Sequence, residues 1–274
     1  MTDADRDFLR TTFGQDAARY DLARPRYPEQ TFADLAELAR LGPDSRVLEI
    51  GCGTGKATLP LARLGCTVVG VELSPEMAAI ARHNLRDFPG VTVEVAAFED
   101  WQPPAEPFDL VLAASAFHWV DPGVRFAKSA GVLRPGGALA VIGNDHVAGG
   151  TERFFVDAQD CYERFDPSTP PGLRQTPAAD LPDDPTEFDE SRPFGPVIFR
   201  RYAWEQEYRT REYMDLLLTY SGHRALPPPA REGLLACLAD LIDRDHGGRI
   251  SKAYLTRLAL ARRRPPARPR PAGE

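Results

Sequence analysis

A glycine-rich segment is the part of this sequence best suited to holding a ligand. It reads Glu49-Ile-Gly51-Cys-Gly53-Thr-Gly55 and follows the apolar run 46–50 directly. Glycine lets the backbone turn tightly and approach a ligand that a Cβ atom would hold away. The GxGxG spacing differs from the GxGxxG of dinucleotide-binding folds, and the sequence has no GxxxxGK[ST] phosphate loop. The segment therefore predicts a close backbone contact with a ligand and gives no support to nucleotide hydrolysis.

An acidic residue further along the chain strengthens this prediction. Glu72 ends a second apolar run, 67–72, and comes 21 residues after Gly51. At the end of a strand next to a glycine loop, a carboxylate can accept hydrogen bonds from the two ribose hydroxyls of a nucleoside. An exposed and unpaired glutamate is the alternative for Glu72 alone. The loop and the carboxylate together favour a nucleoside-containing ligand.

Alternating strand and helix patterns position these residues. Short apolar runs predict strands over 46–50, 67–72, 91–95, 108–112 and 138–142. Helices are expected between them, over 56–64, from Ser74-Pro75 to Pro89-Gly90, and from Asp121-Pro122 to Arg134-Pro-Gly-Gly137. This alternation predicts a parallel sheet with helices on both faces. Further on, we expect helices over 153–166, 211–220 and 228–243, strands over 197–208 and 249–261, and a solvated acidic loop within 167–196.

Composition excludes several classes of protein. The 274 residues carry a net charge of −7, which opposes binding to a nucleic-acid backbone. No apolar stretch is long enough to span a membrane, and the N-terminal residues lack the apolar run of a signal peptide. The four cysteines show no CxxC spacing, so we interpret them as reduced thiols rather than as a metal site or a disulfide framework. We therefore expect a cytoplasmic protein without a metal, a nucleic-acid partner or a membrane partner.

The order of these motifs resembles a known family. Segments 47–55, 69–74, 108–112 and 133–137 are similar to successive motifs of class I S-adenosylmethionine-dependent methyltransferases. Segments 13–28, 116–122, 219–224 and 247–249 are similar to the small-molecule branch of that family (methyltransferase type 11), which includes trans-aconitate methyltransferase-like enzymes. The resemblance extends to about residue 262. It implies an α/β, Rossmann-like fold with seven strands, mostly parallel, helices on both faces and an antiparallel C-terminal hairpin.

The resemblance also implies a division of the chain. A single methyltransferase domain would span 1–262, and a disordered tail rich in Pro and Arg would span 263–274. Within the domain, we expect an N-terminal lid at 1–30 and a cofactor-binding core at 31–143. An acceptor-side cap would follow at 144–225, with a C-terminal helix and strand at 226–262.

Family roles can be assigned to matching positions. The resemblance implies a cofactor site for S-adenosylmethionine, with S-adenosylhomocysteine as the product, formed by Glu49, Gly51, Gly53, Gly55, Glu72, Leu73, Met77, Phe98, Glu99 and Ala114. The glycines would line the methionine part, and Glu49 would orient the loop or the cofactor's ammonium group. Glu72 would bind the ribose, and Leu73 and Met77 would pack against the adenine. A plain core position is the alternative for Met77.

Acceptor-side roles fall on residues after the fourth strand, after the fifth strand (144–146) and in the N-terminal segment. His118 and Tyr20 are the candidate catalytic residues: His118 as a general base or an orienting group, Tyr20 at the methyl channel. A structural histidine beside Trp119 is the alternative for His118. Candidate substrate-binding residues are Arg24, Trp119, Asp145 and His146.

We therefore expect methyl transfer to a small molecule by in-line displacement, with O-methylation of a carboxylate or hydroxyl favoured over C- or N-methylation of a natural product. Three other interpretations are weaker. An RNA methyltransferase is opposed by the net charge and by Ala114-Ser-Ala-Phe117, which lacks the Asn/Asp-Pro-Pro-Tyr/Phe motif. A non-catalytic S-adenosylmethionine-binding protein would keep the same loop. A nicotinamide oxidoreductase is disfavoured by the GxGxG spacing and by the lack of a Tyr-xxx-Lys pair. The expected assembly is a monomer or a homodimer.

Overall fold

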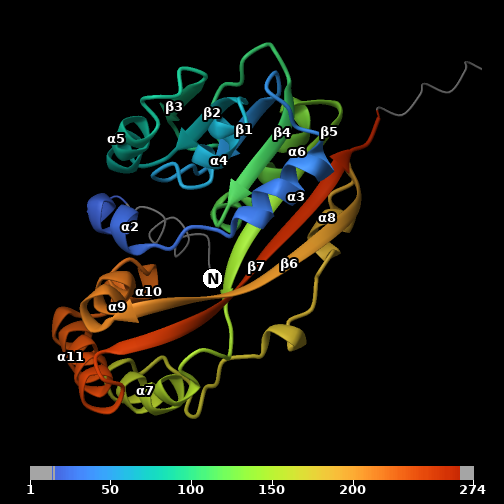
Figure 1. Ribbon diagram of the computed structural model, residues 1–274. Coiled ribbons are helices and arrows are strands. Elements are labelled where there is room, and N and C mark those ends of the chain that lie inside the picture. Colours follow the sequence, from blue (N-terminus) through green and yellow to red (C-terminus); the bar gives the residue numbers. More distant parts are fainter. Residues whose placement is uncertain (1–13, 15, 266–274) are drawn as a thin grey trace, which may run out of the picture.

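One seven-stranded sheet organises the chain. The computed structural model describes residue 14 and residues 16–265. The strands lie in the order β3-β2-β1-β4-β5-β7-β6 (Figure 1). Their bounds are β1 Arg46–Ile50, β2 Thr67–Glu72, β3 Val91–Val95, β4 Phe108–Ala114, β5 Leu133–His146, β6 Phe194–Arg209 and β7 Arg249–Arg263. Neighbours among β1 to β5 are parallel, whereas β7 is antiparallel to β5 and to β6. The predicted sheet with an antiparallel C-terminal hairpin is confirmed.

Helices cover both faces of the parallel part, because its strands are apolar on both sides. One hydrophobic core joins Leu48 and Val111 to Val132 of α6, and a second joins Val47 and Leu110 to Leu35 of α3 on the opposite face. The helices here are α3 Glu29–Ala39, α4 Thr58–Arg63, α5 Pro75–Asn84 and α6 Pro122–Val132. Two of them begin where the sequence predicts, with Ser74 and Asp121 as side-chain N-caps. Ser74 comes two residues after the end of β2, so α5 begins next to the carboxyl edge of the sheet.

The fifth strand is longer than predicted. It begins at Leu133 and runs to His146, beyond the expected 138–142. The reason is its antiparallel partner β7, which pairs with β5 as far as His146 opposite Tyr254. Asn144 and Asp145 therefore lie on the strand itself rather than in a loop after it.

A cap of helices packs at the far end of the long strands β6 and β7 (Figure 1). Its helices are α7 Glu152–Phe165, α9 Thr210–Leu217, α10 Ser221–Ala225 and α11 Pro228–Asp245, whereas α8 Thr186–Glu190 lies near the other end of β6 and packs Phe188 into the first core. Side chains of α7, α9 and α11 share a third core with Tyr254 of β7, built around Phe154, Leu216 and Leu238. The N-terminal helix α2 Ala17–Ala23 contacts both α9 of the cap and α5. Helix α2 therefore connects the cap to the glycine-loop half of the molecule.

A disulfide in the cap corrects the interpretation of all cysteines as free thiols. Cys161 of α7 and Cys237 of α11 are bonded, with their Cα atoms 5.9 Å apart. Cys52 and Cys66 are free and buried. Sequence spacing gave no sign of this pair, because 76 residues separate its members and only the packing of α7 against α11 brings them together.

Reduction of this bond is expected to destabilise the protein. A cross-link over 76 residues removes chain entropy from the unfolded state, by about 4 kcal/mol of unfolding free energy. Thermal unfolding with and without reductant measures the effect. The Cys161→Ser/Cys237→Ser variant should unfold at the temperature of the reduced protein, and adding reductant should not change its melting temperature. Equal melting temperatures for oxidised and reduced protein would contradict the bond's role.

The C-terminal boundary also differs from expectation. Arg263 is the last residue of β7, and the backbone and side chain of Arg264 donate to the carbonyls of Pro193 and Phe194. The expected disordered tail, 263–274, therefore overlaps the sheet at its start, and 266–274 lie outside the described residues. Residues 1–13 and 15 of the expected lid also lie outside the described residues. No helix in the described part of the chain is both long enough and apolar enough to cross a bilayer.

Candidate functional site

A cavity of about 620 Å³ opens at the carboxyl ends of β1, β2, β4 and β5. Ligands bind at this edge in open α/β sheets. Every site residue predicted from the sequence, apart from Gly55, lines it: Tyr20, Arg24, Glu49, Gly51, Gly53, Glu72, Leu73, Met77, Phe98, Glu99, Ala114, His118, Trp119, Asp145 and His146. Glycine-loop residues and acceptor-side residues thus share one space.

The glycine loop follows β1 in a conformation that favours glycine. Gly51, Gly53 and Gly55 have φ values of +63°, +58° and +87°. A Cβ atom on Gly51 would lie 2.6 Å from the Cβ of Ala116, so the loop approaches the turn after β4 closely. A Cβ on Gly55 would instead lie 2.8 Å from Leu85, the residue that follows α5. Gly55 therefore serves helix packing in this structure, which explains its absence from the cavity wall.

Glu72 holds the glycine loop from the adjacent strand. It is 8% exposed and its two carboxylate oxygens accept hydrogen bonds from the backbone N–H groups of Gly53, at 2.8 Å, and Ser74, at 2.9 Å. Burial raises the pKa of this carboxyl, and the N–H donors oppose that rise. Beside it, the buried hydroxyl of Thr54 has no hydrogen-bond partner among the residues that the structure describes, and Thr54 lines the cavity. A polar ligand at this end would find both an acceptor and a hydroxyl.

Glu49 lies beneath the loop and is almost fully buried. It is 1% exposed and accepts a 2.6 Å hydrogen bond from the hydroxyl of Thr58 in α4. Burial raises the pKa of Glu49 to about 8, against the effect of Thr58 and with a smaller contribution from the charge of Glu72. Glu49 is therefore largely protonated at neutral pH while no cation is near it.

The turn after β4 is strained where it meets the cavity. Ser115 has a φ of +55°, which is uncommon for a residue with a Cβ atom. Its hydroxyl accepts a 3.0 Å hydrogen bond from Tyr27, a cavity residue of the N-terminal segment. Strain of this kind clusters at ligand sites. Sequence analysis missed Tyr27 as a site residue, although it lies in the N-terminal segment on which the resemblance rests.

His118 projects into the cavity from a 3-10 turn, Phe117–Trp119. Its ring lies 4.7 Å from the ring of Trp119, measured between centroids. Burial and then the Arg125 guanidinium lower the pKa of His118, against the charge of Glu187. The imidazole is therefore neutral at pH 7 and able to accept a proton.

An ion pair close to His118 joins α6 to α8. Arg125 of α6 is 7% exposed, donates to the carbonyl of Phe117 at 3.2 Å and binds Glu187 of α8 at 2.5 Å. Glu187 belongs to the segment expected to be a solvated acidic loop. The side chain of Glu187 is 61% exposed, as that interpretation implies, but it lies on a helix rather than in a loop and has a cationic partner. Asp183 also has one, Arg201 of β6 at 3.1 Å. Sequence spacing could not reveal these partners, because they come from distant elements.

The N-terminal segment closes the cavity through Arg24. Its guanidinium donates to the hydroxyl of Thr219 at 2.8 Å and to the Thr219 carbonyl at 3.0 Å. It also lies over the rings of Tyr220, 4.1 Å from the centroid, and Tyr20, 5.2 Å from the centroid. Arg24 therefore fastens the N-terminal segment to the start of α10 and keeps a cationic face on the cavity.

His146 ends β5 beside a group of tyrosines. Its Nε2 atom lies 3.0 Å from the hydroxyl of Tyr220, and its ring packs edge-on against Tyr254 of β7. Burial, followed by the charges of Lys252, Arg24 and His223, lowers the pKa of His146 to about 3. His146 is therefore a neutral hydrogen-bonding group throughout the physiological range.

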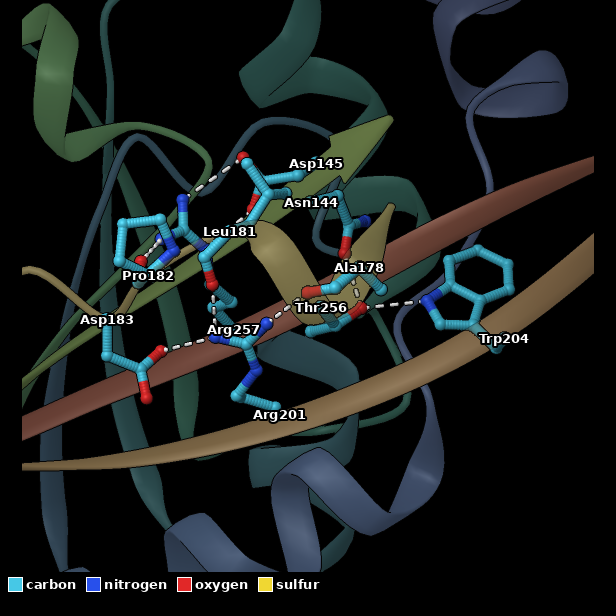
Figure 2. A network of polar contacts seen from close by, with 10 residues as sticks. All are labelled: Asn144, Asp145, Ala178, Leu181, Pro182, Asp183, Arg201, Trp204, Thr256 and Arg257. Carbon is cyan, nitrogen blue, oxygen red and sulfur yellow. Dashed lines mark hydrogen bonds and ion pairs between the residues drawn. The ribbon is translucent and has the colours of Figure 1, made fainter. Parts of the chain in front are cut away.

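Asp145 is held by Arg257 of β7 in a polar network (Figure 2). Two guanidinium nitrogens of Arg257 contact the two carboxylate oxygens of Asp145, at 2.6 and 3.1 Å, and a third donates to the carbonyl of Pro182. Figure 2 shows Arg201 bound to the neighbouring stretch, at the carbonyls of Leu181 and Ala178. The network anchors the segment 178–183 against β6 and β7 and neutralises Asp145.

No metal centre is formed by the residues that the structure describes. Among residue 14 and residues 16–265, no group of three or more His, Cys, Asp or Glu side chains is arranged to hold a metal ion. The acidic and imidazole groups of the cavity are instead distributed between its two ends. The cavity therefore has polar groups at the glycine loop and a second set near His118 and His146, and each set could bind an organic molecule.

Comparison with known proteins agrees with this geometry. Residues 47–137, which contain the glycine loop, Glu72 and the start of β5, match the family described as "Methyltransferase domain". They form a class I S-adenosylmethionine-dependent methyltransferase domain. The sheet order and the cavity at its carboxyl edge belong to the same architecture.

Two curated relatives share the methyltransferase domain. An uncharacterized methyltransferase of Mycobacterium tuberculosis is 37% identical over 144 residues, which is 53% of this chain and 56% of the relative. A ubiquinone biosynthesis O-methyltransferase of Xanthomonas axonopodis is 35% identical over 128 residues, 40% of this chain and 54% of the relative. The chain thus spans about half the length of these curated relatives.

One solved structure resembles almost the whole chain. It is a protein of Anaeromyxobacter dehalogenans described as a candidate type II methyltransferase. The match has a TM-score of 0.58 and 26% identity, and covers 88% of this chain and 99% of the other. The similarity therefore includes the cap beside the methyltransferase domain.

Proposed function

We propose that this protein transfers the methyl group of S-adenosylmethionine to a small-molecule acceptor. The observation that carries the proposal is the shared cavity, which joins the glycine loop and Glu72 to His118, His146 and the N-terminal segment. A methyl donor at the glycine-loop end and an acceptor near His118 and His146 would meet inside it. The related O-methyltransferase of Xanthomonas supports oxygen as the methylated atom. We therefore favour O-methylation of a carboxylate or a hydroxyl.

The residues at the glycine-loop end fit the cofactor. Gly53 at φ +58° leaves space that a side chain would fill, and Met77 lies beside it. Glu72 presents carboxylate oxygens for the ribose hydroxyls, and the hydroxyl of Thr54, which has no partner in residue 14 or residues 16–265, could bond a polar group. We expect Glu49 to lose its proton and pair with the ammonium of the methionine part.

When bound, S-adenosylmethionine supplies a methyl group that is electrophilic because it is attached to a sulfonium. What remains for the protein is positioning and exclusion of water, which contribute roughly 7–11 kcal/mol in well-oriented reactions. Arg24 and Tyr20 cover the cavity, and Tyr220 and His146 bound the acceptor half. His118, neutral at pH 7, would accept the proton of a hydroxyl acceptor as that oxygen attacks.

The direct test is product formation. Purified protein would be incubated with S-adenosylmethionine and panels of carboxylic acids, phenols and amines, with mass spectrometry of both S-adenosylhomocysteine and a product heavier by one methylene. The proposal expects both products together, first among the oxygen acceptors. Methylated amines alone would overturn the preference for oxygen, and no transfer to any member would favour the non-catalytic interpretation.

Replacing His118 by alanine is expected to lower turnover by about 100-fold, since a general base contributes roughly that much or more. Affinity for S-adenosylhomocysteine should stay within error, because the glycine loop is untouched. His83→Ala is the matched control, as His83 is exposed on α5 away from the cavity. Wild-type turnover in His118→Ala would leave His118 a structural role.

Cofactor affinity is expected to rise with pH as pH approaches about 8. The pKa of Glu49 is raised to about 8 in the free protein, and pairing with an ammonium favours its ionised form, so binding must release a proton below that pH. Titration calorimetry in two buffers of different ionisation enthalpy measures this release. The Glu49→Gln variant should release no proton from this position. Equal proton release by wild type and variant would exclude Glu49.

A further inference from the structure

The sheet ends at β6, whose outer side pairs with no other strand in the part of the chain that the structure describes (Figure 1). On its inner side, residues 197–209 pair with β7, and Thr210 continues the ladder by donating to the carbonyl of Gly248. Hydrogen-bonded pairs alternate along an antiparallel ladder. The even-numbered residues of β6 therefore bond to β7, and the odd-numbered residues direct their N–H and C=O groups outward.

This outer edge lacks two of the usual protections against pairing with another chain. Exposed edges are commonly blunted by proline, by a β-bulge or by charged side chains. Residues 197–209 include no proline, and their register with β7 has no bulge. Their charges are divided by sign, since arginines at 200–201 precede Ala203, whereas Glu205 and Glu207 follow it. Two antiparallel copies of this edge would place unlike charges together.

A second copy of β6 fits the edge when a two-fold axis passes through Ala203. Outward groups can bond across the axis because odd-numbered residues then lie opposite odd-numbered residues. In this register Arg201 lies opposite the partner's Glu205, and Phe199 lies opposite the partner's Glu207. Unlike charges directly across a ladder stabilise it, and the symmetry forms each pair twice. Such an interface uses the same patch of both copies and closes after two subunits.

Charges favour this register over the next one along the strand. Moving the axis forward by one residue would set Arg201 opposite the partner's Glu207, a residue that Arg249 of its own chain already binds at 3.0 Å. Glu205 has no cationic partner among the described residues and accepts a hydrogen bond from a serine hydroxyl. Arg201 bonds segment 178–183 through Nη1 and Nη2, and no contact in the described part of the chain uses its Nε donor. An ion pair can therefore form across the axis without breaking an existing one.

Two outward carbonyls of β6 accept hydrogen bonds from side chains of their own strand. Arg200 donates to the carbonyl of Phe199 at 3.0 Å, and Gln206 donates to the carbonyl of Glu207 at 2.9 Å. Both donors are long and exposed, so backbone N–H groups of a second strand can replace them and leave them solvated. Phe199 and Glu207 are also the residues that face each other in the register centred on Ala203.

The same register covers exposed apolar surface. Leu22 of α2 is 87% exposed and lines a second hollow, of about 550 Å³, beside Gln206 and Tyr208. Ile198, near the other end of β6, is 41% exposed. With the axis at Ala203, the partner's Ile198 lies opposite Tyr208 and therefore next to this hollow. Pairing would remove apolar surface from water at both ends of the interface.

We propose that two copies of this protein pair antiparallel through β6, with the axis at Ala203, and form a homodimer with one continuous sheet. The observations that carry the proposal are the unpaired outer edge, the division of its charges by sign and the exposed apolar residues that this register brings together. The inference concerns assembly and does not depend on the proposed function. It selects the homodimer from the two assemblies that the sequence leaves open and assigns its interface.

Analytical ultracentrifugation of the full-length protein over a series of concentrations tests the assembly. We expect the mass to rise with concentration to twice that of one chain. Ala203→Pro should raise the dimer dissociation constant about tenfold or more, because it removes the two backbone bonds at the axis. The fold should survive, since the N–H of Ala203 faces away from β7 and proline is tolerated on that side of an edge strand. Thermal unfolding of the variant checks this.

A cysteine at the axis tests the register. The Cα atoms of a hydrogen-bonded antiparallel pair lie about 5.5 Å apart, within the range that a disulfide spans. Ala203→Cys should therefore give a cross-linked dimer when oxidised glutathione is added. Gln206→Cys is the matched control, because it is exposed on the same strand but lies opposite the partner's Arg200 and should not cross-link.

A change of charge tests the ion pairs. Glu205→Arg would set like charges opposite each other and should raise the dissociation constant about fivefold. Glu106→Arg makes the same change in net charge at an exposed site away from β6 and should leave the dimer intact.

Wild-type protein that stays monomeric at every concentration would overturn the second copy as the occupant of this edge. A dimer that resists Ala203→Pro and Glu205→Arg and does not cross-link through Ala203→Cys would also overturn it, because that dimer must use another face. If Ala203→Pro fails to fold, the cross-linking pattern and the charge variant decide the question.

Discussion

Replacing Glu72 by alanine is expected to weaken binding of S-adenosylmethionine by about 100-fold or more, since two charge-assisted hydrogen bonds to the ribose would be lost. The same change leaves the backbone N–H groups of Gly53 and Ser74 without their acceptor, which loosens the loop that must surround the cofactor. Titration calorimetry with S-adenosylhomocysteine measures the loss without turnover.

Two comparisons make this prediction specific. Glu72→Gln keeps an oxygen acceptor and should retain part of the affinity. Glu106→Ala removes the same type of side chain at an exposed position outside the cavity, where it pairs with Arg46 on the surface, and should bind as wild type. If Glu72→Ala bound as tightly as Glu106→Ala, Glu72 would not contact the cofactor.

Gly53→Val is expected to lose cofactor binding by a similar factor, about 100-fold, for a steric reason. A residue with a Cβ atom costs roughly 1–2 kcal/mol in the left-handed region that Gly53 occupies. Its side chain would also fill the space beside the Met77 methyl, which lies 3.6 Å from the Cβ position. The expected result is lost affinity together with modestly lower thermal stability, measured by calorimetry and by thermal unfolding.

A second glycine separates strain from obstruction. Gly172 has a φ of +67°, open space around its Cβ position and no place in the cavity wall. Gly172→Val should therefore lose similar stability and keep full affinity. Equal affinity losses in both variants would mean that backbone strain, rather than occupation of the cofactor space, weakens binding.

Local patterns were sufficient to predict the parallel half of the fold and the glycine-loop end of the cavity. Gly51 and Glu72 end consecutive strands of the predicted sheet, and parallel strands bring such ends to one edge. The N-caps Ser74 and Asp121 could be read from the sequence because they act on their own helices. These features depend on residues close together in the chain.

The acceptor half could not be predicted in this way, because it is built from long-range pairings. Tyr254 reaches His146 only through the antiparallel register of β5 and β7. The Arg125–Glu187 pair and the Cys161–Cys237 bond join elements that are dozens of residues apart.

Calorimetric titration of the purified protein with S-adenosylmethionine, S-adenosylhomocysteine and NAD tests the central claim most directly. We expect micromolar binding of both adenosyl ligands and no binding of NAD, because the loop has the spacing GxGxG rather than the GxGxxG of a dinucleotide site. Binding of NAD, or no binding of either adenosyl ligand, would contradict the assignment of the cavity to S-adenosylmethionine.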